Sequence, residues 1–315
     1  MNESGGLILA GVDGTEAGLA AARYAAGEAV RCGGTLQLVH VVDPYVPPLA
    51  AWPVAPARPD PGLLRRGREI LVETERTISE SGAQISTQLL LGRPATMLTI
   101  EASKARLVVL GDQPRTLIQR VGTSSVLAPV ATHSPVPVVA VPATWSSQDV
   151  PREIVVGVQD VATSIALVRR GLEVAAARGA SLRLLHVWHP VDAYQDYLTV
   201  GTEEQRWTER AEHELTAALE TARDGSAPAI TQVPARIEVV QAQAAYALVE
   251  ASRHADLLIL GRGRFLGFGH LGGTARAVLR ESECPVEIDP HVAPTFDDVA
   301  AAADVTDARA RSGSG

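Results

Sequence analysis

Leu257-Leu258-Ile259-Leu260-Gly261-Arg262-Gly263-Arg264 is the stretch of sequence from which the fold can be predicted. Its apolar first half has no polar interruption, which is typical of a strand buried on both faces of a sheet. A glycine-rich turn follows, and residues 275–280 have the pattern of a helix. In α/β proteins a strand, a glycine loop and a helix in this order often hold a phosphate, because the helix start directs N–H groups toward the anion.

The spacing within this loop favours a ligand site without proving one. Nine residues separate Gly263 from Gly273, and Thr274 follows at once. A hydroxyl group at this position can donate to a phosphate oxygen, and Arg262 and Arg264 can pair with phosphate as well. Glycine-rich turns after strands are common and often bind nothing, so the loop needs support from the rest of the chain.

Length and composition place the chain among ordinary globular proteins. It has 315 residues, which favours about two domains, and it is 46% apolar and 20% charged. The net charge of -8 argues against a nucleic-acid partner bound through a basic surface. Cys32 and Cys284 form no metal-binding spacing and suggest no disulfide framework. With no signal peptide and no apolar run that could span a bilayer, we expect a cytoplasmic protein without a membrane partner.

The pattern of strands and turns occurs twice along the chain. Gly157 follows Gly11 at the same offset at which His186 follows His40, and later matches keep nearly the same offset. A constant offset indicates a duplicated domain. We expect one domain over residues 1–147, a second over residues 148–291, and a flexible tail over residues 292–315, which has too little apolar surface to order itself.

Each half alternates five strands with four helices, which predicts an open, Rossmann-like α/β fold with a parallel sheet and helices on both faces. In the first half we expect strands near residues 7–12, 36–42, 84–91, 107–111 and 136–141, and helices near residues 17–32, 63–81, 94–104 and 124–132. Ligands bind such sheets beyond the carboxyl ends of the strands, where the strand order reverses.

The segments Gly11-Val12-Asp13-Gly14-Thr15, Leu38-Val39-His40-Val41, residues 257–261, and Gly263 with Gly273-Thr274 resemble the universal stress proteins, whose duplicated form is common in actinobacteria. The resemblance covers about residues 6–290. It implies two tandem open parallel five-stranded sheets of strand order 3-2-1-4-5. It also implies, for one branch of the family, ATP bound in the crevice, while another branch lacks the phosphate loop and does not bind ATP.

The resemblance further implies which residues would hold the nucleotide. In ATP-binding members an aspartate after the first strand and a valine at the end of the second contact adenosine, and a Gly-x2-Gly-x9-Gly loop followed by Ser or Thr holds the phosphates. The matching positions in this chain are Asp13, Val41, Gly111, Gly122, Thr123, Gln159, Val187, Gly261, Gly263, Gly273 and Thr274.

Neither half has the complete family pattern. In the first half Pro114 takes the place of the second glycine and removes a donor, and Asp112 adds negative charge near the phosphates. In the second half Gln159 replaces the aspartate, and Gly263 follows Gly261 one residue early. We expect the first half to be the better adenosine site and the second the better phosphate site, with ATP, alone or with Mg²⁺, bound mainly in the second half.

His40 and His186 take matching positions before the two valines. For both we favour a structural role at a strand end over contact with a ligand. His270 lies inside the predicted phosphate loop, where it can contact a phosphate or only solvent.

The sequence has no nucleophile–base pair, no metal-ligand spacing and no GK[ST] motif. We therefore predict no catalytic residue and no metal site, and a cytoplasmic stress-response protein that binds ATP or a related adenine nucleotide as a regulatory ligand. Two alternatives stay open: a scaffold whose nucleotide sites have decayed, and a weak ATP-hydrolysing enzyme.

The last strand of each half, residues 136–141 and 285–288, is expected at a sheet edge, where exposed backbone groups invite pairing. In the family that these halves resemble, such strands join two domains. We therefore expect the halves to pair as an intramolecular pseudo-dimer, and two chains to associate further as a homodimer.

Overall fold

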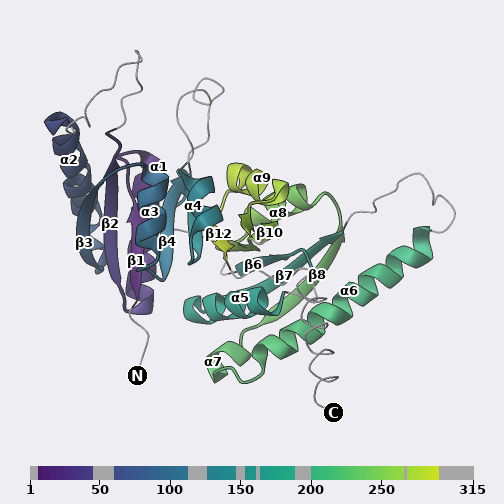
Figure 1. Ribbon diagram of the computed structural model, residues 1–315. Coiled ribbons are helices and arrows are strands. Elements are labelled where there is room, and N and C mark those ends of the chain that lie inside the picture. The colour runs from purple at the N-terminus through teal and green to yellow at the C-terminus, as the bar shows by residue number, and fades with distance from the viewer. Residues whose placement is uncertain are drawn as a thin grey trace, which may run out of the picture.

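The computed structural model describes residues 6–44, 60–112, 126–146, 153–160, 164–188, 200–265 and 268–290. Two of the predicted nucleotide-binding residues, Gly122 and Thr123, lie outside these ranges, as does the predicted tail. The described part forms an α/β protein in which strands and helices alternate in both halves (Figure 1).

The first half contains β1 (Leu7–Gly11), α1 (Glu16–Cys32), β2 (Thr35–Val42), α2 (Pro61–Ile78), the short 3-10 helix η1 (Ser79–Ser81), β3 (Gln84–Leu91), α3 (Pro94–Ala102), β4 (Leu107–Asp112), α4 (Leu127–His133) and β5 (Val138–Pro142). The second half contains β6 (Glu153–Val158), α5 (Ile165–Arg178), β7 (Ser181–Trp188), α6 (Val200–Arg223), α7 (Pro228–Thr231), β8 (Ala235–Gln241), α8 (Ala244–Ser252), β9 (Leu257–Gly261), β10 (Gly263–Phe265), β11 (Phe268–His270), α9 (Gly273–Glu281) and β12 (Val286–Asp289).

The strands of the two halves form one sheet of ten strands in the order β3-β2-β1-β4-β5-β12-β9-β6-β7-β8. Within each half the strands are parallel and keep the 3-2-1-4-5 order that the family resemblance implied. The two five-stranded sheets are joined edge to edge, because β5 and β12, the last strand of each half, pair antiparallel, with Val139 opposite Glu287. Each half alone would leave the backbone N–H and C=O groups along one edge of its last strand exposed. The pairing gives these groups of both strands hydrogen-bond partners.

Antiparallel pairing at the junction makes the strands of the two halves run in opposite directions. The carboxyl ends of the first half's strands and those of the second half's strands therefore lie at opposite edges of the common sheet. A crevice at each set of carboxyl ends would open away from the other crevice.

One apolar core covers each face of the sheet, because successive residues of a strand point to opposite faces. In β1, Ile8 and Ala10 belong to the core beneath α1, α2, α5 and α6, whereas Leu9 belongs to the core beneath α3, α4, α8 and α9. Both cores continue from the first half into the second. The buried face of α1 is mostly alanine, which lets this helix lie close against the sheet.

A buried ion pair ties α5 to the central strand β12. Glu287 is 1% exposed and accepts hydrogen bonds from Nε and Nη2 of Arg170 at 2.7 and 2.9 Å. Burial by itself would lower the pKa of the Arg170 guanidinium, but the charge of Glu287 and its hydrogen bonds hold that pKa above its ordinary value. Arg170 therefore stays charged.

Arg262 links the two halves at the end of β9. Its Nη1 donates to the carbonyl oxygens of Thr132 and Ser134 at 2.8 and 2.9 Å, at the carboxyl end of α4 in the first half. The last carbonyl groups of a helix lack partners within the helix, and a positive charge is favourable there. The interpretation of Arg262 as a phosphate ligand was therefore wrong, because its guanidinium is directed at the other half.

The substitution Arg262→Ala should destabilise the protein, because it removes the donor to the carbonyl groups of Thr132 and Ser134. Hydrogen bonds to a charged group are worth about 1.5–3 kcal/mol, and we expect a loss of about 2 kcal/mol in the free energy of unfolding. This loss is measured by urea unfolding, with circular dichroism as the signal. Arg280→Ala removes an exposed pair with Glu281 as the control and should cost under about 1 kcal/mol. Equal losses in the two variants would contradict a role for Arg262 at the junction.

Candidate functional site

The first candidate crevice lies beyond the carboxyl ends of β1 and β4, which are neighbours in the sheet. The chain leaves β1 toward β2 on one side and leaves β4 toward β5 on the other, so this is the point where the strand order reverses. The structure brings Asp13 and Gly111 to this point, as the sequence predicted.

Asp13 is exposed and held in one orientation by the start of α1. Its Oδ1 accepts hydrogen bonds from the backbone N–H and the hydroxyl of Thr15, at 3.0 and 2.5 Å. The Thr15 hydroxyl oxygen in turn accepts the N–H of Gly18 at 3.1 Å and so caps the helix. The other carboxylate oxygen, Oδ2, has no hydrogen bond within the described ranges, which leaves it available to a ligand.

Gly18 makes this arrangement sterically possible. A Cβ atom at this position would lie 2.6 Å from Oδ1 of Asp13. No motif singles out Gly18 in the sequence. The only available signal is a glycine in the first turn of an alanine-rich helix.

Gly111 is required by packing. A Cβ atom there would lie 2.4 Å from the carbonyl carbon and oxygen of Ala17, because the end of β4 touches the first turn of α1. The matching residue in the second half, Gly261, is exposed, and a Cβ atom there would meet only the side chain of Leu167 at 3.6 Å, an ordinary contact. Packing thus requires glycine at position 111 but not at the matching position 261.

The two histidines support the strand ends. Nδ1 of His40 donates to the carbonyl oxygen of Val12 at 2.7 Å, and Nδ1 of His186 donates to that of Val158 at 2.9 Å. Each ring joins the second strand of its half to the residue at the end of the first. The structural interpretation of both histidines is confirmed.

The valines follow the histidines in the same strands. Val41 and Val187 are half-buried and pair with Leu90 and Val240 of the next strand. Both therefore lie near the carboxyl edge of their half, where the sequence predicted contact with adenosine.

In the second crevice Gln159 takes the position that Asp13 has in the first. Gln159 is exposed directly after β6. Ser164, at the N-cap of α5, makes no capping hydrogen bond with its side chain. The start of α5 also leaves more room at Gly261 than α1 leaves at Gly111.

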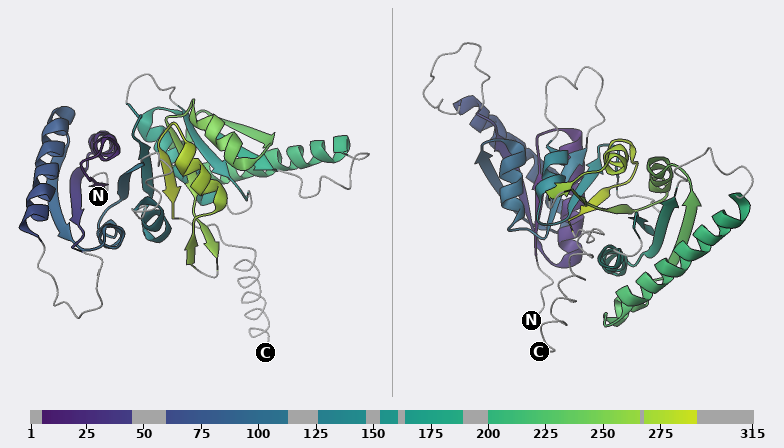
Figure 2. Two further views of the ribbon diagram at one scale, coloured as in Figure 1. Left: turned by 90° about the horizontal axis from the view of Figure 1, so that it is seen from above. Right: turned by 45° about the vertical axis from the view of Figure 1, so that its right-hand side comes forward.

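The loop after β9 folds into a hairpin that the sequence did not predict. Strands β10 and β11 pair antiparallel, with Gly263 opposite His270, and β11 lies beside α4 of the first half (Figure 2). The pairing brings Gly263 back to within three residues of Gly273. Gly263, Gly273 and Thr274 therefore lie at the same end of the loop.

The start of α9 is open and lacks a side-chain cap. Gly273 and Thr274 are exposed, and a Cβ atom at Gly272 or Gly273 would have no atom within 4 Å. The first backbone bond of the helix runs from the N–H of Arg276 to Gly272, so the three N–H groups before it have no backbone acceptor within the helix. Nε of Arg276 donates to the carbonyl oxygen of Leu271 at 2.8 Å and fixes the end of the loop.

This helix start can bind an anion. Its N–H groups are directed outward, the helix dipole favours negative charge, and the Thr274 hydroxyl is exposed beside them. Within the described ranges, no group of three or more His, Cys, Asp or Glu residues could hold a metal ion. None of the helices in those ranges is both long and apolar enough to cross a membrane.

Comparison with known proteins gives two matches to one family, one in each half of the chain. The model of the universal stress protein family matches residues 7–142 and again residues 151–289. A universal stress protein of Mycolicibacterium smegmatis is 27% identical over 294 residues, 89% of this chain and 96% of that protein. One from Mycobacterium tuberculosis is 26% identical over 298 residues, 89% of this chain and 93% of that protein.

Solved structures agree on the fold. A universal stress protein from Archaeoglobus fulgidus has a TM-score of 0.63 at 15% identity, covering 90% of this chain and 96% of that chain. A functionally unknown protein from Pseudomonas aeruginosa has a TM-score of 0.57 at 14% identity, covering 93% of this chain and 94% of that chain. At such identities the likeness concerns the fold alone.

Substituting alanine for Gly111 and for Gly261 should show that packing requires only the first of these glycines. Gly111→Ala forces a Cβ atom against the backbone of α1, and overpacking of this kind costs about 1–3 kcal/mol of unfolding free energy. Gly261→Ala meets only ordinary contacts and should change that free energy by less than about 0.5 kcal/mol. Urea unfolding of both variants checks this, and equal destabilisation would show that the close contact at Gly111 is absent.

Proposed function

Because this chain belongs to the universal stress protein family in its tandem form, we propose that it is a cytoplasmic stress-response protein that binds ATP or a related adenine nucleotide as a regulatory ligand, mainly in its second half. The family resemblance provides the nucleotide class, since one branch of the family binds ATP. The observation that carries the proposal is the open start of α9 at Gly273 and Thr274.

The second half offers donors where the triphosphate would lie. Three backbone N–H groups and the Thr274 hydroxyl meet at the start of α9, and no side chain of the helix caps them. The net charge of the chain is -8, so a triphosphate gains nothing from the overall field and depends on these local donors. Mg²⁺ bound to the phosphates would lower the negative charge that these donors must neutralise.

The adenosine end of the site would be formed by Gln159 and Val187. The Gln159 amide can both donate to and accept from a ribose or an adenine, without the charge of an aspartate. In the first half, Asp13 has the better geometry for a ribose, with Oδ1 fixed by Thr15 and Oδ2 available. We propose that the first half binds the whole nucleotide more weakly, because Asp112 and Pro114 are unfavourable for the phosphates.

The departures from the family pattern favour one alternative, a scaffold without nucleotide. Gln159 stands where ATP-binding members have a carboxylate, and the loop after β9 is folded as a hairpin. In either case the two halves would act as an intramolecular pair through β5 and β12, and we propose that two chains can associate further as a homodimer. Sedimentation of the full chain at several concentrations tests this association.

Gly273→Glu should abolish ATP binding, because it places a carboxylate where the triphosphate would lie. Gly273→Ala is the matched control: a Cβ atom at this position has no neighbour within 4 Å, so neither variant should disturb folding. We expect isothermal titration calorimetry to detect ATP with the natural chain and with Gly273→Ala, and no binding with Gly273→Glu.

Two outcomes of this experiment would overturn the proposal. Absence of binding to the natural chain at millimolar ATP, with no rise in thermal stability, favours the scaffold, since saturation at 100 times Kd should add about 2.7 kcal/mol. Equal binding to both variants would place the nucleotide elsewhere. Sustained phosphate release that Thr274→Ala abolishes would instead favour the weak enzyme.

A further inference from the structure

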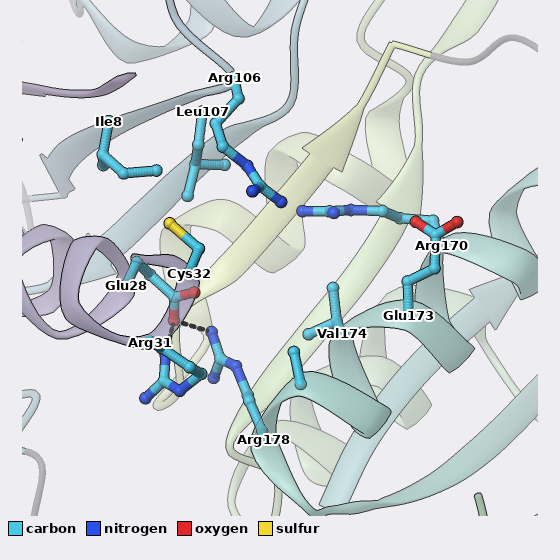
Figure 3. A pocket seen from close by; sticks show the side chains of 11 residues that line it. Ile8, Glu28, Arg31, Cys32, Arg106, Leu107, Arg170, Glu173, Val174 and Arg178 are labelled. Atoms are coloured by element: carbon cyan, nitrogen blue, oxygen red, sulfur yellow. Dashed lines mark hydrogen bonds and ion pairs between the residues drawn. The ribbon is translucent and has the colours of Figure 1, made fainter. Parts of the chain in front are cut away.

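A cleft of about 100 Å³ lies where the two halves meet, and four arginines line it (Figure 3). Arg31 and Arg106 come from the first half, and Arg170 and Arg178 come from α5 of the second. None of the residues that line the cleft is a predicted nucleotide-binding residue. Arg106 precedes β4 and so lies at its amino end, away from Gly111, whereas α9 packs on the other face of the sheet from α5.

The guanidinium groups of Arg106 and Arg170 point toward one another across this cleft (Figure 3). Arg170 donates Nε and Nη2 to Glu287, and its Nη1 has no hydrogen bond with any residue of the described ranges. Arg106 is exposed and forms neither an ion pair nor a side-chain hydrogen bond with those residues. Two positive charges that face each other repel, and an anion between them would remove the repulsion.

Before any ligand arrives, Arg170 is anchored by its hydrogen bonds and the stem of Arg106 is packed against the chain. The stem of Arg106 lies over Gly6, where a Cβ atom would be 2.6 Å from Cδ of the arginine, and its backbone N–H donates to Leu7 at 2.8 Å. Glu287 anchors Arg170 from beneath. Groups that are already fixed lose little conformational entropy when they bind a ligand.

The charges around the cleft leave positive charge unneutralised on the side of the first half. Arg31 and Arg178 share one carboxylate, that of Glu28, as the dashed lines show (Figure 3). The other carboxylate of the lining, Glu173, is exposed, and its negative charge acts on Arg170 from beyond ion-pair distance and helps to raise the pKa of that guanidinium. Glu287 and Asp289 lie within 4.0 Å of Arg170 and balance that arginine, but not Arg106.

We propose that this cleft binds a small phosphate-class anion, either free inorganic phosphate or the phosphate group of a small phosphomonoester, between Arg106 and the Nη1 group of Arg170. Planar guanidinium groups suit tetrahedral oxyanions because they donate two parallel hydrogen bonds. Pockets for larger ligands occupy about 300–1,000 Å³, so about 100 Å³ fits an ion rather than a nucleotide. Since the two arginines come from different halves, the anion would also join the halves.

Calorimetric titration of the full chain with inorganic phosphate, at an ionic strength held constant with chloride, tests the proposal. Arg106→Gln should weaken phosphate binding by roughly tenfold or more, the effect of losing one charged donor. Arg68→Gln is the matched control, since Arg68 is exposed on α2 and has no ion pair within the described ranges. Because Arg106 has no partner there either, both variants should fold, and circular dichroism confirms that they do.

The same experiment must distinguish phosphate bound in this cleft from phosphate bound at the proposed nucleotide site. In a Gly273→Glu background, which excludes an anion bound at the start of α9, phosphate binding at the cleft should persist and should still be weakened by Arg106→Gln. Loss of phosphate binding in Gly273→Glu with retention in Arg106→Gln would place the anion at α9 and overturn the proposal. No binding to the natural chain at millimolar phosphate would overturn it as well.

A second titration, with glycerol phosphate, separates the two sources of the anion. Binding tighter than that of inorganic phosphate, and again weakened by Arg106→Gln, identifies a phosphomonoester. Tighter binding of inorganic phosphate identifies the free ion. Equal affinity of either probe for the natural chain and for Arg106→Gln would contradict the proposed contact.

Discussion

The antiparallel contact between β5 and β12 is the constraint on which the rest of the structure depends. It turns two open sheets into one sheet of ten strands and lets each apolar core extend through both halves. It also brings α5 beside α1 and places the end of β9 near the end of α4. The Arg262 link and the arginine cleft exist only because these elements meet, and the two candidate crevices lie at opposite edges of the sheet for the same reason.

Duplication of a domain does not oblige its copies to keep the same chemistry. The first half keeps an ordered carboxylate at Asp13, supported by the cap of α1. The second half has Gln159 at the matching position and an open helix start at Gly273. The two copies thus match different parts of the family pattern. The shared sheet joins both halves in one structural unit.

Much of the fold could be predicted from the sequence, because apolar runs, glycines and the constant offset between repeats are local signals. The position of Asp13 near Gly111 followed from the strand order that the family resemblance implied. The hairpin β10–β11 could not be predicted, since two strands of three residues leave no periodic pattern. The partner of Arg262 was missed because it depends on a contact between distant segments. Gly111 and Gly261 appear equivalent in the sequence, and only the position of the neighbouring helix shows that one of them is required by packing.

The central claim is that the start of α9 receives the phosphates of a nucleotide. Backbone amide resonances report on this position directly, without any substitution in the chain. On titration with ATP, the amide signals of Gly273, Thr274 and Ala275 should show the largest shifts in the NMR spectrum, because their N–H groups would gain an acceptor. Unchanged signals at these three residues in saturating ATP would contradict the account.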